Sequence, residues 1–171
     1  MERSAIMIRL LALILVLSGA QPLLAVEAGE SAPDFSLPAR NSTTLTLSAY
    51  RGKLVYLDFW ASWCSSCRES IPWMNTLKGR VGADDFEIIA VNLDTRPSSA
   101  EELLEELGVT FPVVFDAKGE TPERFAVEAM PSSYLIDRDG KVVSVFVGFS
   151  AEHRKQIESE IKKLLAIGEE L

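Results

Sequence analysis

The chain has 171 residues, a length typical of a single domain, and its 47% apolar and 25% charged residues argue against an intrinsically disordered protein. Its net charge of −8, from 25 acidic and 17 basic residues, disfavours nucleic acid as the partner, because binding a polyanion needs a basic face. Two cysteines and one histidine are too few for a disulfide-stapled scaffold or for a closed zinc site, which takes four ligands.

The first 25 residues have the pattern of an export signal. Arg3 and Arg9 flank a short basic region, residues 10–17 form an apolar run, and small residues follow as far as Ala25. The run is far shorter than the roughly 20 residues that a membrane span needs, which favours a cleaved signal over a permanent anchor. We take cleavage to follow Ala25, with Ala20 as the alternative.

This pattern divides the chain into a signal peptide, residues 1–25, and one exported domain, residues 26–171. Export would place the protein in the periplasm or elsewhere outside the cytoplasm, where disulfides persist. The alternative is a protein tethered to the membrane by an uncleaved N-terminal anchor.

The first elements of the exported domain are predicted from hydrophobic periodicity. Residues 43–47 alternate with period two and indicate a short strand, paired with residues 34–37. Residues 53–60 are almost wholly apolar, which is typical of a strand buried on both faces. A helix is expected from about Cys64 to Gly79, with a kink at Pro72.

The middle of the chain alternates between strands and helices. Residues 86–92 predict a second buried strand, and residues 113–115 a short one. Residues 99–107 carry leucines at helical spacing and end before a glycine, and residues 121–127 predict a short helix.

The last part of the chain predicts a β-hairpin and a helix. Residues 132–137 and 141–147 flank an Arg-Asp-Gly turn, and residues 151–167 have one apolar face at helical spacing. Alternating strands and helices that end in a hairpin indicate the α/β class, with helices packed on a mixed sheet.

Cys64 and Cys67 lie directly after a buried strand, at the predicted start of a helix. Unpaired backbone N–H groups and the helix dipole favour a thiolate there, which lowers the pKa of Cys64 below the free value of about 8.5. Cys64 would therefore attack a substrate disulfide and Cys67 would resolve the mixed disulfide. We expect Cys64 to be exposed and Cys67, one turn into the helix, to be shielded.

Two other roles for the cysteines are weaker. A bridge across so short a loop removes little entropy from the unfolded chain, so stabilisation is a poor reason for it. A metal site would need further ligands, and only His153 is available, in a polar stretch where a solvated side chain is expected.

Asp58 stands in the middle of an otherwise apolar strand, where burying a carboxylate is costly. Burial raises the pKa of a carboxyl group, and a group tuned in this way can accept the proton of Cys67 as Cys67 attacks. The alternative is that Asp58 faces solvent at a strand edge. Trp63 is assigned a supporting role beside the cysteines, and Trp60 a packing role.

The chain resembles the thioredoxin superfamily and, within it, the exported TlpA/ResA-type thiol–disulfide oxidoreductases. The resemblance rests on residues 58–67, Asp-Phe-Trp-Ala-Ser-Trp-Cys-Ser-Ser-Cys, and on Met130-Pro131. Residues supporting the subgroup are 32–37, 47–53, Arg68, Pro72 and 134–140.

The resemblance implies a thioredoxin fold with an N-terminal β extension and a helix–strand insertion that matches residues 99–115. It also implies a redox-active Cys64–Cys67 pair, and a cis Pro131 beside it whose loop pairs with substrate backbone. The base rate of cis X–Pro bonds, about 5–6%, would by itself favour trans.

Three positions depart from the pattern of these relatives. Ser65 and Ser66 stand between the cysteines, where the family often has a proline, so the reduction potential is not transferable. Members that mature cytochrome c commonly carry a glutamate at the position of Ser70, and the subgroup often has asparagine at the position of Asp58. These departures favour a broader disulfide reductase over a dedicated cytochrome c role.

We therefore predict an exported thiol–disulfide oxidoreductase that reduces protein disulfides through Cys64 and Cys67, with no soluble cofactor and no metal. The expected partners are disulfide-containing exported proteins, apocytochrome c among them, and a membrane electron transporter as reductant. We expect a monomer that does not bind nucleic acid.

Two other functions are compatible with parts of the sequence. Residues 32–35, Ala-Pro-Asp-Phe, also open the peroxiredoxins, but residues 60–64 lack the proline and threonine of the peroxidase motif Pro-x-x-x-Thr-x-x-Cys. A redox-inert binding module or metallochaperone on the same fold is the third possibility. Copper chaperones of this fold resemble Cys-x-x-x-Cys with a distal histidine, whereas this chain has the shorter spacing.

Overall fold

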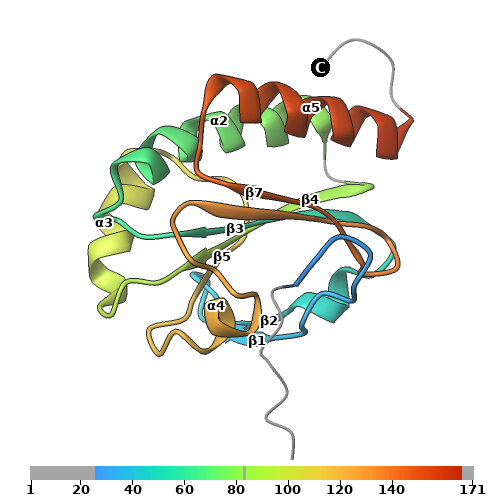
Figure 1. Ribbon diagram of the computed structural model, residues 1–171. Helices are drawn as coiled ribbons and strands as arrows, with labels where there is room; N and C mark the ends of the chain where they lie inside the picture. Colours follow the sequence, from blue (N-terminus) through green and yellow to red (C-terminus); the bar gives the residue numbers. More distant parts are fainter. Residues whose placement is uncertain (1–25, 83, 167–171) are drawn as a thin grey trace, which may run out of the picture.

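The computed structural model describes residues 26–82 and 84–166, and its centre is one mixed β-sheet (Figure 1). Five strands lie in the order β5-β4-β3-β6-β7. Their bounds are β3 Leu54–Trp60, β4 Phe86–Asn92, β5 Val113–Phe115, β6 Ser132–Ile136 and β7 Val142–Val147. The predicted signal peptide, residues 1–25, lies outside the described residues.

Strand β3 is the central strand, and all seven of its residues are buried. It runs parallel to β4, with Trp60 opposite Asn92, and antiparallel to β6, with Phe59 opposite Ser132. The C-terminal ends of β3 and β4 and the start of β6 therefore meet at one edge of the sheet. Ligand and catalytic sites of open α/β sheets gather at this kind of edge.

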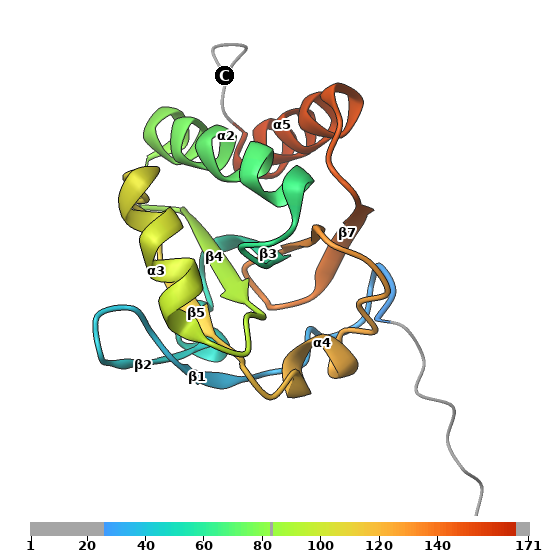
Figure 2. The ribbon, with the colours of Figure 1, turned by 90° about the vertical axis from the view of Figure 1, so that its left-hand side faces the viewer.

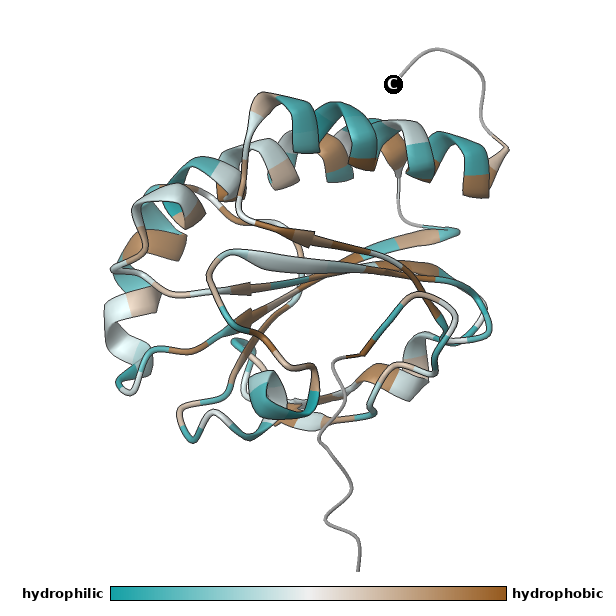
Figure 3. Ribbon diagram, viewed as in Figure 1, coloured by the Kyte–Doolittle hydropathy of each residue, from teal (hydrophilic) through white to brown (hydrophobic). Residues whose placement is uncertain are grey.

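The two faces of the sheet are covered by different elements (Figures 1 and 2). Helices α2 (Ser65–Val81), α3 (Pro97–Glu106) and α5 (Ala151–Leu165) pack their apolar residues into one core cluster with alternate residues of β3. The other face carries β1 (Ser36–Pro38), β2 (Thr44–Thr46), the 3-10 helix η1 (Leu47–Tyr50) and α4 (Glu120–Arg124). In Figure 3 the apolar residues of α5 turn toward the sheet and its polar residues away from it.

This architecture confirms the predicted α/β class and thioredoxin fold. β1 and β2 pair antiparallel and form the N-terminal β extension, while α3 and β5 form the helix–strand insertion. Helix α2 continues through Pro72 to Val81, two residues beyond the predicted end.

Helices α3 and α4 also differ from their predicted bounds. Helix α3 begins at Pro97, two residues early, because proline fits the first helical position, where its missing N–H is not needed. Helix α4 covers only Glu120–Arg124, because Ala126 turns into the left-handed region (φ 53°) and the N–H of Val127 bonds back to the carbonyl of Pro122 at 2.9 Å. Within the described part of the chain, no helix is long and apolar enough to span a membrane.

Candidate active site

Cys64 is the N-cap of helix α2, directly after the loop that leaves β3. Its backbone is extended (φ −84°, ψ 111°), and the N–H of Cys67 donates a hydrogen bond to its Sγ at 3.2 Å. The sulfurs of Cys64 and Cys67 are bonded, at 2.10 Å, across a Cα–Cα distance of 5.3 Å. The predicted placement of the leading cysteine at the helix start is confirmed.

The two sulfurs differ less in exposure than the sequence predicts. Cys67 is fully buried, as expected, but Cys64 is only 7% exposed. Trp63, Ser66 and Met130 line the same hollow as Cys64. An attacking or attacked group therefore reaches the pair from one side, that of Cys64.

The loop between β3 and Cys64 is held by a buried carboxylate that sequence reasoning missed. Asp94, 4% exposed, accepts hydrogen bonds from the N–H of Ser62 at 2.9 Å and from its hydroxyl at 3.0 Å. The side-chain amide of Asn92 donates to the same carboxylate at 2.8 Å. The parallel register that puts Trp60 opposite Asn92 brings these groups together. The one signal in the sequence that could have indicated Asp94 is its place just beyond a buried strand.

Met130 and Pro131 lie across the sheet edge from the cysteine loop, as the pairing of Phe59 with Ser132 requires. Their peptide bond is cis, which the resemblance implied and the base rate disfavoured. The carbonyl of Pro131 accepts a hydrogen bond from the N–H of Gly148 at 2.7 Å.

His153 does not have the solvated environment that the sequence predicts. It is half-buried, its Nδ1 lies 3.1 Å from the carbonyl oxygen of Gly148, and its ring packs against Phe146. The polar neighbours of His153 in the sequence gave no sign of these contacts, because they depend on Phe146 in strand β7 and on Gly148 after it. No cluster of three or more potential metal ligands occurs in the described ranges 26–82 and 84–166.

A hollow of about 610 Å³ lies beside the disulfide. Its walls come from the start of α2, from the residue after β4, from α4 and from the segment between α4 and β6. It is lined by Trp63, Cys64, Ser65, Ser66, Leu93, Pro122, Val127, Glu128, Ala129 and Met130. Trp63 is 70% exposed on this wall, whereas Trp60 is fully buried in the core. Trp60 therefore has the packing position that the sequence assigns to it, and the supporting role of Trp63 stays a prediction.

Asp58 lies in the interior and not at a solvent-facing edge. It is 1% exposed and lies on the same face of β3 as Tyr56 and Trp60, whose side chains belong to the core cluster that also contains Cys67. Burial raises the pKa of the Asp58 carboxyl well above its usual value, as the sequence predicts. Among the described residues, none forms a hydrogen bond with Asp58 Oδ2 or with Trp60 Nε1.

The serines around the cysteines have different surroundings. Ser66 Oγ lies 3.6 Å from Sγ of Cys64, close enough for a hydroxyl–sulfur hydrogen bond. Ser70, at the position where some relatives carry glutamate, is fully buried and donates to the carbonyl of Cys67 at 3.0 Å. Ser70 therefore faces the core and not the substrate side of the helix.

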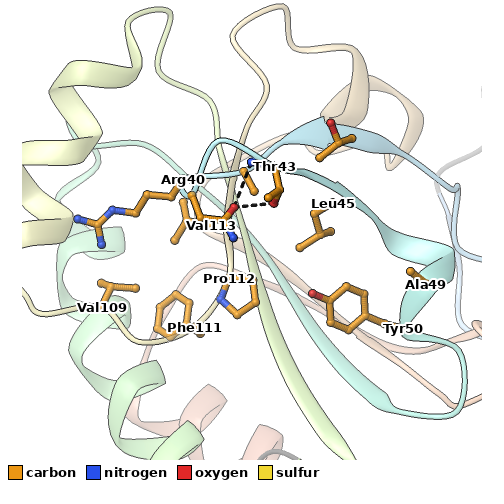
Figure 4. Close-up of a pocket in the computed structure, with 12 residues that line it drawn as sticks. Arg40, Thr43, Leu45, Ala49, Tyr50, Val109, Phe111, Pro112 and Val113 are labelled. Carbon is orange, nitrogen blue, oxygen red and sulfur yellow. Dashed lines mark hydrogen bonds between the residues drawn. The ribbon is translucent and has the colours of Figure 1, made fainter.

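A second hollow, also about 610 Å³, lies away from the cysteines, between the β1–β2 extension and the start of β5 (Figure 4). The rings of Tyr50, Phe111 and Pro112 lie around it, and Arg40 on its wall is paired with Glu101 at 2.8 Å. Neither cysteine lines it, so it takes no part in the site described above.

Comparison with known proteins agrees with this geometry. The Redoxin family matches residues 27–165. The thiol-disulfide oxidoreductase ResA of Geobacillus thermodenitrificans is 37% identical over 139 residues, covering 81% of this chain and 80% of that protein.

Two solved structures are similar over most of the chain. The crystal structure of a thiol:disulfide interchange protein, DsbE, from Chlorobium tepidum superposes with a TM-score of 0.79 at 43% identity, covering 82% of this chain and 99% of that one. The exposed lipoprotein thioredoxin of Streptococcus pneumoniae has a TM-score of 0.64 at 33% identity, covering 77% of this chain and 100% of that one.

Proposed function

This chain belongs to the Redoxin family and is a ResA-like thiol–disulfide oxidoreductase of the thioredoxin superfamily, and from that premise we propose that it reduces disulfides of exported proteins. The observation that carries the proposal is the placement of Cys64 Sγ as the cap of α2, beside a hollow, with Cys67 bonded behind it.

In the reduced protein, Cys64 acts as the nucleophile. The N–H of Cys67, which now lies 3.2 Å from Cys64 Sγ, and the positive end of the α2 dipole both stabilise a thiolate at Cys64. The thiolate attacks one sulfur of a substrate disulfide and forms a mixed disulfide, and the other substrate sulfur leaves as a thiolate, which takes up a proton.

Cys67 completes the exchange. Its sulfur attacks Cys64, the Cys64–Cys67 bond forms, and the bond from Cys64 to the substrate breaks, so the substrate leaves as a dithiol with the two electrons of the pair. Asp58 is the proposed acceptor of the Cys67 proton, because burial raises the pKa of its carboxyl group and because it lies on the face of β3 that packs in one core cluster with Cys67.

Trp63, Met130 and Pro131 are proposed to hold the substrate. Trp63 offers an exposed aromatic face beside Cys64, and the backbone of Met130 forms no hydrogen bond with the described residues. A substrate segment that lies in extended conformation beside Met130 can pair with that backbone.

No soluble cofactor or metal is required, since the cysteine pair itself carries two electrons. Re-reduction needs a dithiol donor, and we propose a membrane electron transporter in that role. The predicted export signal in residues 1–25 supports a location outside the cytoplasm, and the exposed lipoprotein thioredoxin is a similar protein whose name gives it such a location. Apocytochrome c is a candidate substrate on the family resemblance alone.

A trapping experiment tests the reaction. Insulin is mixed with the reduced protein, and the reduction of the insulin disulfides is monitored as the turbidity of the precipitating B chain. Cys64→Ser should abolish reduction, whereas Cys67→Ser should accumulate a mixed disulfide between Cys64 and insulin, detected by mass spectrometry. Full activity of Cys64→Ser would overturn the assignment of the nucleophile.

Asp58→Asn should slow reduction between pH 6 and pH 8, and an unchanged rate there would remove its proposed role as proton acceptor.

Direction is tested by equilibrating the pair with dithiothreitol or glutathione buffers. A reduction potential near the thioredoxin value of about −270 mV would support a reductase. A potential above about −150 mV, toward the DsbA value, would identify an oxidant instead.

Peptide mass spectrometry of the exported protein tests cleavage of the predicted signal peptide after Ala25.

A further inference from the structure

The hollow beside Cys64 has an apolar wall with one ionisable side chain other than the cysteine. Leu93, Pro122, Val127 and Met130 contribute apolar surface, and Trp63 adds an exposed ring. Glu128 is the acidic residue of that wall. A ligand that fills the hollow therefore meets a mainly apolar surface with a negative charge at one point.

The chain direction fixes Glu128 close to the exchange site. Helix α4 stops at Arg124, and the left-handed turn at Ala126 redirects the backbone toward β6. Glu128 then stands two residues before Met130, so their Cα atoms are at most about 7 Å apart. A substrate segment paired with Met130 would carry its neighbouring side chains past the Glu128 carboxylate.

Glu128 is available for a ligand. It is exposed, and it has no hydrogen bond or ion pair with any residue in the described part of the chain. The chain as a whole carries a net charge of −8, which attracts cationic segments and repels acidic ones. Local and overall charge therefore favour the same kind of partner.

We propose that this hollow selects oxidised protein segments in which an apolar residue and a lysine or arginine stand within two or three residues of the attacked cysteine. This inference rests on the proposed function, because it concerns the substrate of the same site. The apolar residue packs against Trp63 and Val127, and the cation pairs with Glu128. Acidic segments are disfavoured at the same place by repulsion from Glu128.

One exposed ion pair sets the size of the expected effect. Such pairs change an equilibrium by about two- to fivefold, and salt weakens them because the charges remain in contact with solvent. Glu128 therefore tunes the choice among disulfides and does not decide whether exchange occurs.

The test compares the reduction of three peptides that share one intramolecular disulfide and one leucine and differ only in a Lys, Gln or Glu residue next to the attacked cysteine. We expect kcat/KM to be about two- to fivefold higher for the Lys peptide than for the Gln peptide, and lower for the Glu peptide. In Glu128→Gln the Lys-to-Gln ratio should fall to about one, and in Glu128→Lys the order of the Lys and Glu peptides should reverse. The differences in kcat/KM between the peptides should shrink as the salt concentration is raised from about 20 to about 500 mM, because salt screens the charge of Glu128.

Glu123→Gln is the matched control. Glu123 is an exposed glutamate on α4 that does not line the hollow, so this variant should keep the wild-type ratio. Equal kcat/KM for the three peptides in the wild-type protein would overturn the inference. A Lys-to-Gln ratio that falls equally in Glu128→Gln and Glu123→Gln would overturn it as well. Failure to reduce any of the peptides would contradict the proposed function itself.

Discussion

Ser62 donates two hydrogen bonds to the carboxylate of Asp94, from its backbone N–H at 2.9 Å and from its hydroxyl at 3.0 Å. The pair connects the loop before Cys64 to the end of β4, which is 32 residues further along the chain. Asp94 is almost completely buried and Ser62 is half-buried, so the carboxylate accepts these bonds where it has little contact with water. The loop that aims Cys64 at the hollow is therefore held by a strand on which neither cysteine lies.

Replacing Asp94 by asparagine should loosen this loop. An amide N–H₂ cannot accept a hydrogen bond, so at least one of the donors from Ser62 and Asn92 is left unpaired in a buried place. We expect Asp94→Asn to lower the free energy of unfolding by about 1–3 kcal/mol, and to speed amide hydrogen exchange at residues 61–64. Urea unfolding of the oxidised protein and exchange followed by mass spectrometry measure the two effects.

Asp116→Asn is the control for a purely structural effect. Asp116 is equally buried and accepts hydrogen bonds from the backbone N–H groups of Gly119 and Thr121, away from the cysteines. It should lose comparable stability while exchange at residues 61–64 stays as in the wild type. Unaltered exchange there in Asp94→Asn would contradict an anchoring role for Asp94.

The Ser66 hydroxyl, 3.6 Å from Sγ of Cys64, is a further group that can stabilise a thiolate. A donor to an ionised sulfur favours the charged form, so Ser66→Ala should slow alkylation of reduced Cys64 by iodoacetamide at pH 7. We expect a decrease of about two- to fivefold, with the pH midpoint of alkylation moving upward. Stopped-flow alkylation of Cys67→Ser proteins, in which only Cys64 reacts, measures it.

Ser65→Ala serves as its partner variant, since Ser65 is exposed and forms no hydrogen bond to either sulfur. Its alkylation profile should match that of the parent protein. A profile for Ser66→Ala that coincides with that of Ser65→Ala would show that the hydroxyl does not reach the thiolate.

The sequence predicts the parts of the site that depend on local signals. The apolar run of β3, the aspartate inside it and the cysteine at the helix start all lie between Leu54 and Cys64, and the structure contains each of them as predicted. Asp94 was missed because its bonds to Ser62 depend on the register between β3 and β4, which no local pattern specifies. The contact of His153 with Gly148 was missed for the same reason.

Exposure was the least predictable property of the site. The position of Cys64 at a helix tip suggests an exposed residue, yet Cys64 is only 7% exposed and lies in the wall of a hollow lined by residues from separate parts of the chain. Glu128 likewise has no local signal, since its role follows from where the chain goes after the left-handed turn at Ala126.

The buried carboxyl of Asp58 makes stability depend on pH. Because burial raises its pKa in the folded protein, the unfolded chain loses this proton at a lower pH than the folded chain does. Between the two pKa values the folded state binds one more proton, so the free energy of unfolding falls as pH rises, by at most about 1.4 kcal/mol per pH unit. Asp58→Asn abolishes this ionisation, so its stability relative to the wild type should grow from about pH 4 upward.

Urea unfolding of both oxidised proteins from pH 4 to pH 8 tests this, and the difference between them cancels groups that titrate in both. Asp85→Asn provides the comparison, because Asp85 is exposed and surface substitutions usually change stability by less than about 0.5 kcal/mol. If the difference between Asp58→Asn and the wild type stayed constant over this range, Asp58 would ionise alike in the folded and unfolded chains. It would then lack the raised pKa that makes it suitable to accept the Cys67 proton.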